Sequence, residues 1–428
     1  MSGKSFVLKG DICYSEDRKT LHCEENAYAV CVDGVSRGVF ETLPEEYRTL
    51  PLTDCSGKLV IPGLSDLHIH AAQFAYRGMY MDVELLDWLK LHAFPEESKF
   101  ADTAYAEKAY SLFADAMKKS VTTRFCAFAS AHTDATEILM EKVAAVGLGA
   151  YIGRVNMDMD APDSLREPDA DFSARETLRW LDDTQGKYER VFPIVTPRFV
   201  LSCTRPLMEK LSDIVKERKV PVQSHLSENL GEIAAVSELF PEFPTYGEVY
   251  DHYNMFGGVS KTIMAHCVYS SPREVDLMEK NGVFIVHCPA SNTNVITGIA
   301  PVRAYFDRGM NMGLGSDVAG GHTESMFRAV VDTVQISKRY WRHIDQGAKP
   351  LTFPEAFYLA TVGGGAYFGK VGSFAEGYEF DAVILDDACL PHPQSLSAAE
   401  RLERAVYLSL DERGGVVGKY VAGEKLAL

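Results

Sequence analysis

Short apolar runs separated by turn residues occupy the two ends of the chain. Residues 1–58, which include SFVLKGDICYS and AYAVCVDGVSRGVF, follow this pattern, and it predicts strands and hairpins without a long helix. Similar runs return after Tyr378 in EFDAVILDD, RAVYLSL and GGVVGKYVAG, with one charged helical interval near Ser397–Arg404. We therefore expect the two ends to pair into one small β-sandwich domain.

The middle of the chain has a different rhythm, in which an apolar run ends in polar residues and a helical stretch follows it. One such stretch, DATEILMEKVAAVG, carries Asp134 as the expected helix N-cap and Gly147 where the helix should end. About eight runs read as strands: residues 60–70, 122–130, 148–158, 191–199, 220–228, 261–269, 282–291 and 312–320. Eight strands alternating with helices predict an α/β fold, a (β/α)8 barrel of the TIM type. We place the barrel at residues 61–370 and the two parts of the β domain at 1–60 and 371–428.

Composition limits the classes of partner and of compartment. Asp and Glu number 60 against 43 Lys and Arg, and no basic stripe interrupts this net charge of −17, so we expect no nucleic-acid partner. The amino-terminal residues lack the apolar core of a signal peptide, and no run approaches the roughly 18 apolar residues of a membrane span. The nine cysteines include no C-x-x-C pair and are expected to be reduced, mostly buried thiols. These features favour a globular protein of the cytoplasm without a membrane partner.

The predicted barrel strands are apolar until their last few residues, where histidine, arginine and aspartate appear. Barrel active sites are built from the carboxyl ends of the strands, so we expect the chemistry there. His68 and His70 point to the same side of the first strand, about 6.6 Å apart along it, and can converge on one metal ion. His225 and Asp317 complete a set of three nitrogens and one carboxylate. Such a set suits Zn²⁺ or Fe²⁺ with one position open for water, whereas unrelated structural roles for the four residues are the alternative.

The sequence favours one metal ion per chain over two. Binuclear members of this barrel class place a bridging carboxylated lysine at the end of the fourth strand, where the run VFPIVTPRF contains no lysine. The thiolate zinc site of cytidine-type deaminases is excluded as well, because His322, Thr323 and Glu324 form H-x-E without a following P-C-x-x-C. We therefore expect a mononuclear site.

Three further residues near these strand ends can take part in catalysis. Glu228 follows His225 by three residues, and with Ser227 capping the next helix its carboxylate can lean over the metal and relay protons. An ordinary carboxylate at a helix amino terminus is the alternative. His266 can hold the attacking water or be a buried structural histidine, and for His287 a structural and a functional role are equally open.

Arg198 and Phe199 end the fourth predicted strand as a cation followed by an aromatic ring. A guanidinium group can donate to a planar carbonyl group, and an aromatic ring can pack on a flat heterocycle. A structural ion pair is the alternative role for Arg198. The two residues together are compatible with a pocket for a flat carbonyl compound.

Seven stretches spread over the predicted barrel carry a resemblance to a known family. They are PGLSDLHIHAAQFAYRG (62–78), VELLDWLKLHAFPEE (83–97), VTPRFVLSC (195–203), QSHLSEN (223–229), MAHCVY (264–269), HCPASN (287–292) and GSDVAGG (315–321). In this order they resemble the amidohydrolase superfamily and, within it, the guanine deaminase family. The resemblance implies metal ligation by His68, His70, His225 and Asp317, handling of the water by Glu228, His266 and Asp317, and contacts to the substrate from Gln73, Arg198, Phe199, His225 and Glu228.

The resemblance also implies the reaction, in which a metal-activated water replaces the 2-amino group of guanine and yields xanthine and ammonia. It implies one Zn²⁺ per chain, with Fe²⁺ as the alternative, and a homodimer. Ala72, Ala290 and Cys267 depart from the family pattern and can alter the shape of the pocket without removing its chemistry. Two alternatives stay open: deamination of another aminated heterocycle, such as a triazine, a pterin or a cytosine-like compound, and a non-catalytic barrel used for assembly, although no metal ligand is missing.

Overall fold

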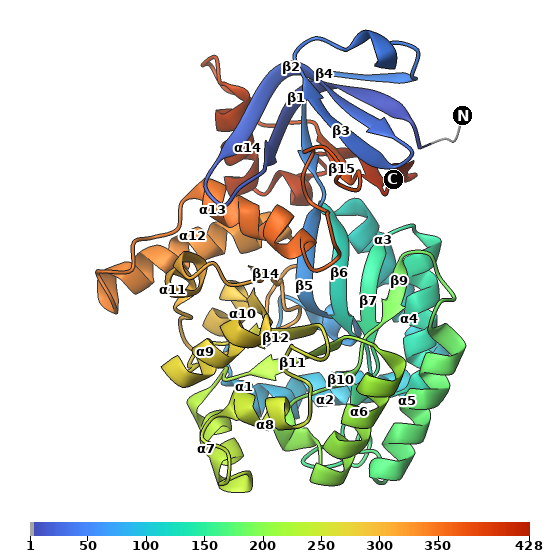
Figure 1. Cartoon of the computed structure of the whole chain (residues 1–428), viewed down its shortest axis with the longest axis vertical. Coiled ribbons are helices and arrows are strands. Elements are labelled where there is room, and N and C mark those ends of the chain that lie inside the picture. The colour runs from blue at the N-terminus through green and yellow to red at the C-terminus, as the bar shows by residue number, and fades with distance from the viewer. Residues whose placement is uncertain (1–3) are drawn as a thin grey trace.

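The computed structural model, which describes residues 4–428, has a β-rich part at one end of the molecule and a larger α/β part at the other (Figure 1). Seven strands build the β-rich part: β1 Phe6–Ser15, β2 Leu21–Val32, β3 Val35–Phe40, β4 Leu52–Pro62, β15 Ala382–Leu385, β16 Val416–Val421 and β17 Glu424–Lys425. They form one mixed sheet in the order β17-β16-β15-β4-β1-β2-β3. Segments from the two ends of the chain therefore lie side by side in one sheet.

β4 is the strand that joins the two ends. It pairs in parallel with β1 and antiparallel with β15, so that Leu59 lies opposite both Asp11 and Leu385. Leu59 and the three residues after it are buried, as a central strand requires. The chain leaves the sheet at the end of β4 and returns to it only at β15, with the whole α/β part in between.

Each of the eight apolar runs that the sequence predicts as strands contains a strand region of the α/β part, although residues 60–62 belong to β4. The runs 148–158 and 191–199 each contain two short strands, so ten strands make up the eight regions. Their bounds are β5 Leu64–His70, β6 Thr122–Phe128, β7 Gly149–Gly153, β8 Val155–Asn156, β9 Val191–Pro193, β10 Thr196–Pro197, β11 Val222–Leu226, β12 Thr262–His266, β13 Phe284–His287 and β14 Met312–Leu314. β5, β6, β7 and β9 form one parallel sheet, β11 to β14 form another, and β8 pairs with β10. A parallel bridge between Val195 and Val222 links the first group to the second. The fold is thus mixed α/β with parallel sheets.

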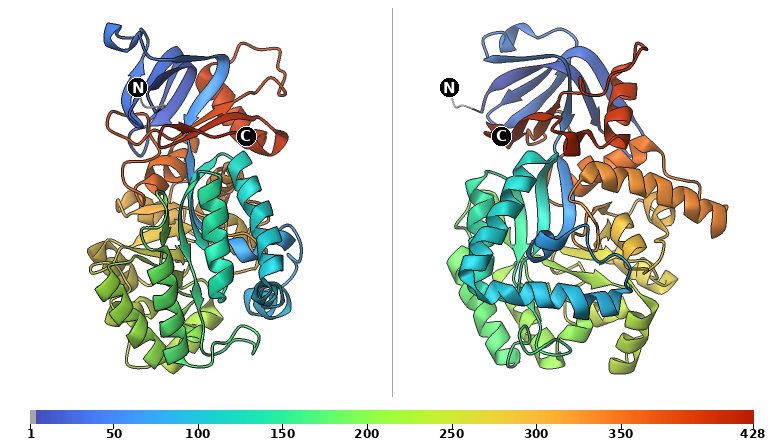
Figure 2. Two further views of the ribbon diagram at one scale, coloured as in Figure 1. Left: turned by 90° about the vertical axis from the view of Figure 1, so that its right-hand side faces the viewer. Right: turned by 180° about the vertical axis from the view of Figure 1, so that it is seen from behind.

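Helices follow most of these strands and lie outside them in both views of Figure 2. The α-helices are α1 Leu85–Trp88, α2 Phe94–Glu97, α3 Thr103–Lys119, α4 Thr133–Ala145, α5 Ala170–Thr184, α6 Arg205–Arg218, α7 Leu230–Leu239, α8 Tyr246–His252, α9 Pro272–Asn281, α10 Pro289–Asn294, α11 Val302–Asp307, α12 Met326–His343, α13 Phe353–Tyr358 and α14 Ala398–Tyr407. Short 3-10 or π turns cover η1 Glu45–Tyr47, η2 Ala71–Tyr76, η3 Leu89–Ala93, η4 Ser98–Ala101, η5 Val200–Ser202, η6 Leu359–Gly363 and η7 Leu410–Arg413.

Two expectations about helix boundaries are wrong. The run RAVYLSL is not a strand, because α14 extends to Tyr407 from a capping box at Ser397, with its buried residues at helical spacing. Asp134 is not the N-cap of α4: the helix begins one residue earlier, and Asp134 lies in its first turn and pairs with Arg179. The carboxyl end is as expected, since Gly147 follows the last turn with a φ of +79°.

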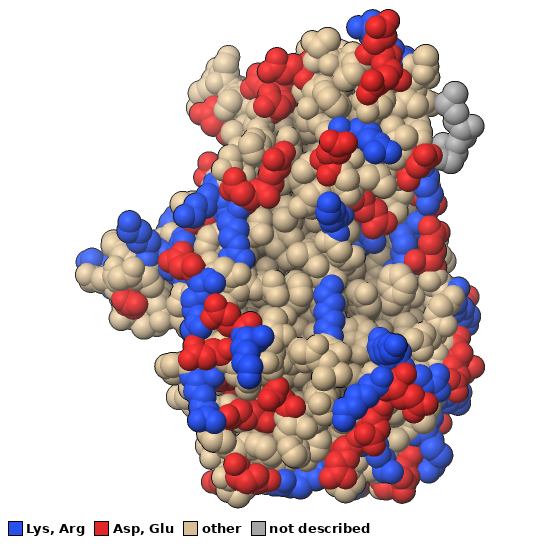
Figure 3. Space-filling view, viewed as in Figure 1, with Lys and Arg blue, Asp and Glu red and all other residues tan. Residues whose placement is uncertain are grey.

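The strands of the α/β part surround a shared apolar cluster that includes Leu67, Cys126, Ile194, Ile263 and Val286. All nine cysteines are free thiols, and seven of them are buried, as expected. Within residues 4–428 there is no helix with the length and apolar character needed to span a bilayer. On the face drawn in Figure 3, Lys and Arg side chains are interspersed with Asp and Glu.

Lys419 is buried where the small sheet meets the α/β part. From β16 its ammonium group donates to the backbone oxygens of Met117 in α3 and Thr122 in β6, each at 3.0 Å. Burial lowers the pKa of Lys419 from 10.5 to about 7, and the nearby Asp381 offsets only part of this effect. Lys419 therefore loses its proton in the folded protein at a pH at which it stays charged in the unfolded chain.

Replacing Lys419 with Met is expected to flatten the pH dependence of the free energy of unfolding between about pH 7 and 10. In this window the unfolded chain holds the lysine proton and the folded protein does not, so Lys419 makes stability rise with pH by up to about 1.4 kcal/mol per unit. Urea unfolding at several pH values measures the slope. Lys425→Met, at an exposed lysine of β17, is the control and should keep the wild-type slope. An unchanged slope in Lys419→Met would contradict this explanation.

Candidate metal centre and active site

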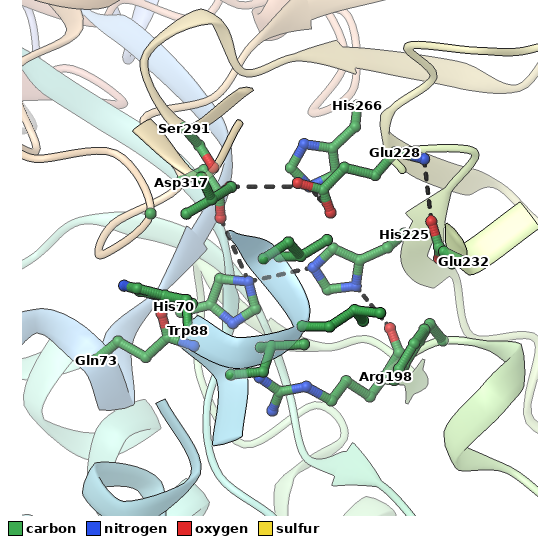
Figure 4. A pocket seen from close by; sticks show the side chains of 16 residues that line it. His70, Gln73, Trp88, Arg198, His225, Glu228, Glu232, His266, Ser291 and Asp317 are labelled. Carbon is green, nitrogen blue, oxygen red and sulfur yellow. Dashed lines mark hydrogen bonds and ion pairs between the residues drawn. The ribbon is translucent and has the colours of Figure 1, made fainter. Parts of the chain in front are cut away.

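A pocket lies at the carboxyl ends of the parallel strands. Eight predicted site residues line it, and all of them except Phe199 are labelled in Figure 4: His70, Gln73, Arg198, Phe199, His225, Glu228, His266 and Asp317. The ninth, His68, is fully buried, and its ring centroid lies 4.9 Å from those of His70 and His225. The structure therefore brings together all nine residues that the sequence analysis singles out for the site.

The four predicted metal ligands present their donor atoms to one another. Asp317 Oδ1 lies 3.1 Å from His68 Nε2 and 3.4 Å from His70 Nε2. His225 Nε2 lies 3.3 Å from His70 Nε2 (Figure 4). Donor atoms of His68, His70 and Asp317 fall within 4.8 Å of one another, as do those of His68, His225 and His266. Such short distances between donor atoms from four strand ends are typical of a metal site.

The protonation states of two histidines suit metal binding. Burial lowers the pKa of His70 and of His225 well below the ordinary value, and the neighbouring imidazoles strengthen the effect. Both rings are therefore neutral near pH 7 and keep a lone pair. His225 Nδ1 lies 2.6 Å from the backbone oxygen of Arg198 and donates to it, which leaves Nε2 as the acceptor that faces the other ligands.

Asp317 and His68 supply the remaining evidence for a cation site. Burial alone raises the pKa of Asp317, but the adjacent histidines, His68 first among them, hold it below the ordinary value, so the carboxylate stays ionised. The ring of His68 is fully buried, its Nδ1 has no hydrogen-bond partner among the described residues, and its Nε2 faces Asp317 Oδ1 at 3.1 Å. A buried imidazole beside an ionised carboxylate is a suitable ligand for a cation. The donor set therefore fits a divalent ion of the Zn²⁺ or Fe²⁺ type.

Asp66 ties two of the ligand-bearing segments together, and sequence reasoning gave it no role. Its carboxylate accepts from the backbone nitrogen of Ser316 at 3.0 Å, from the Ser316 hydroxyl at 2.5 Å, and from the backbone nitrogen of His68 at 3.2 Å. The end of β5 also pairs with the segment after β14, because the backbone nitrogen of Asp317 donates to the His68 oxygen at 2.8 Å. These bonds fix His68 and Asp317 relative to each other before any ion binds.

Glu228 faces the ligand cluster from the segment between β11 and α7. Its Oε2 lies 3.4 Å from His266 Nε2, and its Oε1 has no hydrogen-bond partner among the described residues. Burial raises the pKa of Glu228 well above the ordinary value, with further contributions from the charges of Asp317 and Glu232. A carboxyl group that keeps its proton to higher pH and faces the pocket can act as a general acid and base.

The helix that follows Glu228 begins later than expected. Ser227 does not cap it; the Ser227 hydroxyl donates to Glu274, and Asn229 is the N-cap of α7, closing a capping box with Glu232. Asn229 is the N-cap because its side-chain oxygen accepts a hydrogen bond from the backbone nitrogen of Gly231 in the first turn. Glu228 thus precedes the helix instead of lying in its first turn. It is the residue just before the N-cap, and its side chain lines the pocket.

His266 lies between Glu228 and Asp317. Its Nδ1 lies 2.9 Å from Asn292 Oδ1 and donates to it, so Nε2 is the free acceptor of the ring. Burial lowers the pKa of His266 to about 4, which keeps the imidazole neutral. Nε2 lies 3.8 Å from Asp317 Oδ2 and makes no hydrogen bond with a described residue. An unpartnered acceptor at this position can receive a hydrogen bond from a water molecule.

The opposite side of the pocket combines polar donors with an apolar wall. Arg198 and Gln73 contribute the polar groups, and Trp88 belongs to the lining (Figure 4). Phe199 lines the pocket as well. Arg198 also makes the ion pair that was its alternative role, because its Nη1 and Nη2 donate to the buried carboxylate of Glu97. Arg198 therefore has a structural partner and still faces the pocket.

His287 and the three departures from the family pattern do not line this cavity. His287 is buried, burial lowers its pKa to about 3, and neither ring nitrogen has a hydrogen-bond partner among the described residues. It is not among the residues that line the pocket, and neither are Ala72, Ala290 and Cys267. The structure thus gives His287 and the three departures no direct part in the pocket surface.

Sequence reasoning assigned no role to Glu97 and Glu232, two buried acids near the site. Glu97 lies in the quoted stretch VELLDWLKLHAFPEE, but nothing in the pattern shows that this stretch folds over the pocket. Glu232 accepts from the backbone nitrogen of Glu228 at 3.1 Å and from the Tyr246 hydroxyl at 2.9 Å. Its place three residues after an Asn, the spacing of a capping box, is the signal that could have identified it.

Comparisons with known proteins identify the family of the chain. Residues 59–424 match the amidohydrolase family. Guanine deaminases from Dictyostelium discoideum and Mus musculus are 38% and 37% identical to the chain, over 96% and 86% of it and 89% and 82% of their own lengths. A crystal structure of guanine deaminase from C. acetobutylicum with bound guanine in the active site is 42% identical, with a TM-score of 0.95 over 99% of this chain and 100% of that one. The likeness therefore extends over both parts of the molecule.

Proposed function

This chain belongs to the amidohydrolase family, and from that premise we propose that it is a guanine deaminase, which hydrolyses guanine to xanthine and ammonia. The observation that carries the proposal is the arrangement of one pocket. A cluster of metal-binding donors with Glu228 occupies one side, and the donors of Arg198 and Gln73 occupy the other. A flat carbonyl heterocycle between them has its reacting carbon near Glu228 and its oxygen near Arg198.

His68, His70, His225 and Asp317 are the residues that would hold the metal, which we propose to be one Zn²⁺ per chain, with Fe²⁺ as the alternative. Bound there, the ion would supply Lewis acidity and lower the pKa of water from about 15.7 to about 7. The absence of a lysine from the run that ends at Arg198 supports one ion over two. The neutral histidines and the ionised Asp317 support a divalent ion.

Glu228 and His266 handle the protons of the reaction. We infer that His266 Nε2 accepts a hydrogen bond from the attacking water and so orients it toward C2 of guanine. Glu228 takes a proton from this water and delivers it to N3 as the new C–O bond forms. It then passes the second proton to the amino group, the C–N bond breaks, and ammonia leaves. The raised pKa of Glu228 suits a group that must both accept and give a proton.

Arg198 supplies the preference for a 6-oxo purine in this proposal. A guanidinium group has only donors and can bind the O6 of guanine but not a 6-amino group. A hydrogen bond to a charged group contributes about 1.5–3 kcal/mol, so Arg198→Met should lower kcat/KM for guanine by roughly 10- to 200-fold. The loss for 2,6-diaminopurine should be much smaller. The ratio of the two kcat/KM values, at matched metal content, is the measurement, and an unchanged ratio would assign the discrimination to another residue.

The direct test of the function is to incubate purified, metal-loaded protein with guanine, follow the absorbance change to xanthine, and quantify ammonia. Formation of equal amounts of the two products is the expected result. A panel with a triazine, a pterin and a cytosine-like compound tests the alternative substrates, and turnover of one of these without guanine would overturn the proposal. Metal binding without turnover of any compound would indicate a non-catalytic assembly barrel.

We further infer that the eight strand regions close into a (β/α)8 barrel. The Val195–Val222 bridge at one seam and the bond from Asp317 N to His68 O at the other support closure. The apolar cluster shared by the strands supports it as well. The β-sandwich stays a prediction, because the seven strands of the small part form one sheet. The homodimer, the cytoplasmic location and the domain limits 1–60, 61–370 and 371–428 stay predictions.

A further inference from the structure

Glu97 is a buried carboxylate, 1% exposed, that does not line the pocket but contacts two residues that do. Its Oε1 accepts from Gln73 Nε2 at 2.7 Å and from Arg198 Nη2 at 3.0 Å, and its Oε2 accepts from Arg198 Nη1 at 2.5 Å. α2 carries Glu97, η2 carries Gln73, and Arg198 follows β10. One side chain thus connects three separate segments of the pocket wall.

The contact with Glu97 determines what Arg198 can offer a ligand. Two parallel bonds from the terminal nitrogens fix the orientation of the planar guanidinium group, and the remaining N–H groups are left for a partner. The carboxylate also offsets the charge of Arg198, and both side chains are buried. A paired guanidinium favours a neutral carbonyl compound such as guanine, whereas an unpaired one would favour an anion.

The same carboxylate fixes the amide of Gln73. An amide can turn over and exchange its donor with its acceptor, but Nε2 donates to Glu97 while Oε1 accepts from the backbone nitrogen of Ala319 at 3.1 Å. Exchange of the two ends would place two acceptors together at Glu97 and two donors together at Ala319. Gln73 therefore presents its donor and its acceptor to the pocket in one order only.

We propose that Glu97 is a positioning residue for substrate recognition, which holds the Arg198 guanidinium and the Gln73 amide in the arrangement that selects a neutral 6-oxo purine. The inference rests on the proposed function and adds a residue to it. Glu97 acts through its two partners and needs no contact with the substrate. Its removal should therefore change the selection between purines and not only the amount of folded protein.

Glu96, the residue before Glu97 on α2, provides the matched control. It is also buried, but its carboxylate bonds Lys99 and Tyr105 on the outer side of the segment and is not part of the pocket lining. Glu96→Gln changes the same charge by the same substitution one position away. A general effect of losing a buried acid in this segment should appear in both variants, whereas an effect on selection should appear only in Glu97→Gln.

The experiment measures kcat/KM for guanine and for 2,6-diaminopurine in wild type, E97Q, E96Q, R198M and the double variant E97Q/R198M, with metal content and melting temperature recorded for each. In E97Q the ratio of guanine to 2,6-diaminopurine should fall by about 10- to 100-fold, because Arg198 and Gln73 then compete for a single acceptor oxygen. In E96Q the ratio should equal that of wild type. In the double variant the further fall below R198M should be smaller than the fall that E97Q causes alone, since part of the effect of Glu97 passes through Arg198.

Equal losses for both purines in E97Q would overturn the proposal and leave Glu97 as a residue of the fold alone. An additive effect in the double variant would overturn it as well. Should E97Q fail to fold, because the charge of Arg198 is left unpaired, E97D keeps the charge and shortens the reach. A wild-type ratio in E97D would then count against the proposal. Wild type that binds metal but does not convert guanine would overturn the proposed function itself, which separates the two failures.

Discussion

Glu228→Gln should retain the metal and lose about 10²- to 10⁴-fold in kcat, the usual contribution of a general acid and base. The amide preserves the shape of the side chain but can neither take the proton of the water nor give one to N3 or to the leaving amine. Glu228 Oε2 lies 3.4 Å from His266 Nε2, and Glu228 Oε1 has no hydrogen-bond partner among the described residues. Replacement of Oε1 by an amide nitrogen therefore breaks no hydrogen bond of the fold. Steady-state rates, with metal content from elemental analysis, measure the effect.

Glu232→Gln is the matched control for this prediction, because Glu232 lies one helical turn further and also loses a buried charge. Its contacts are with the backbone of Glu228 and with Tyr246, so we expect a moderate loss through misplacement of Glu228 and not a loss of proton transfer. A Glu228→Gln rate within a few-fold of wild type would show that another group carries the protons.

His225→Ala should lose both the metal and the reaction. The replacement removes one of the four proposed metal donors, and the proposed ion, which would lower the pKa of water toward about 7, is needed at neutral pH. We expect the metal content to fall from about one ion per chain to a small fraction of that value, and turnover to fall by more than about 10³-fold. Elemental analysis of dialysed protein measures the metal content per chain independently of activity.

His287→Asn is the control for this experiment, since His287 is another buried histidine at a strand end but lies outside the pocket lining. Its metal content should equal that of wild type. Two ions per chain in the active wild type would refute the mononuclear site. A full metal content in His225→Ala would remove His225 from the ligand set.

The strand positions of the α/β part are predictable because their signal is local. Each run is apolar where it is buried among neighbouring strands and becomes polar where it reaches the pocket, as in the segments that end at His70 and at Arg198. The alternation of side chains along a strand then places His68 and His70 on the same side. These features depend on a few successive residues and on a general rule about barrels, so one sequence suffices to find them.

The contacts of Glu97 cannot be predicted from the sequence in this way. Its partners Gln73 and Arg198 lie 24 and 101 positions away in the chain, at spacings that follow no helical or strand period. Only the path of the segment after β5 brings them together. The predicted start of α7 was wrong for a different reason. Ser227 and Asn229 are both good N-cap residues, and the choice between them depends on Glu274, which accepts a hydrogen bond from Ser227 and lies on a distant helix.

The insertion of the whole α/β part between β4 and β15 has a consequence for the way the protein is made. A ribosome releases β4 about 320 residues before β15, its antiparallel neighbour, which at 5–20 residues per second is a delay of roughly 15–60 s. During that time one edge of β4 has no partner, and unpaired edges invite association between nascent chains. Early folding of β5 to β14 would bring β15 back to this edge, so the speed of that step, more than the stability of the finished sheet, should set the yield of correctly folded protein.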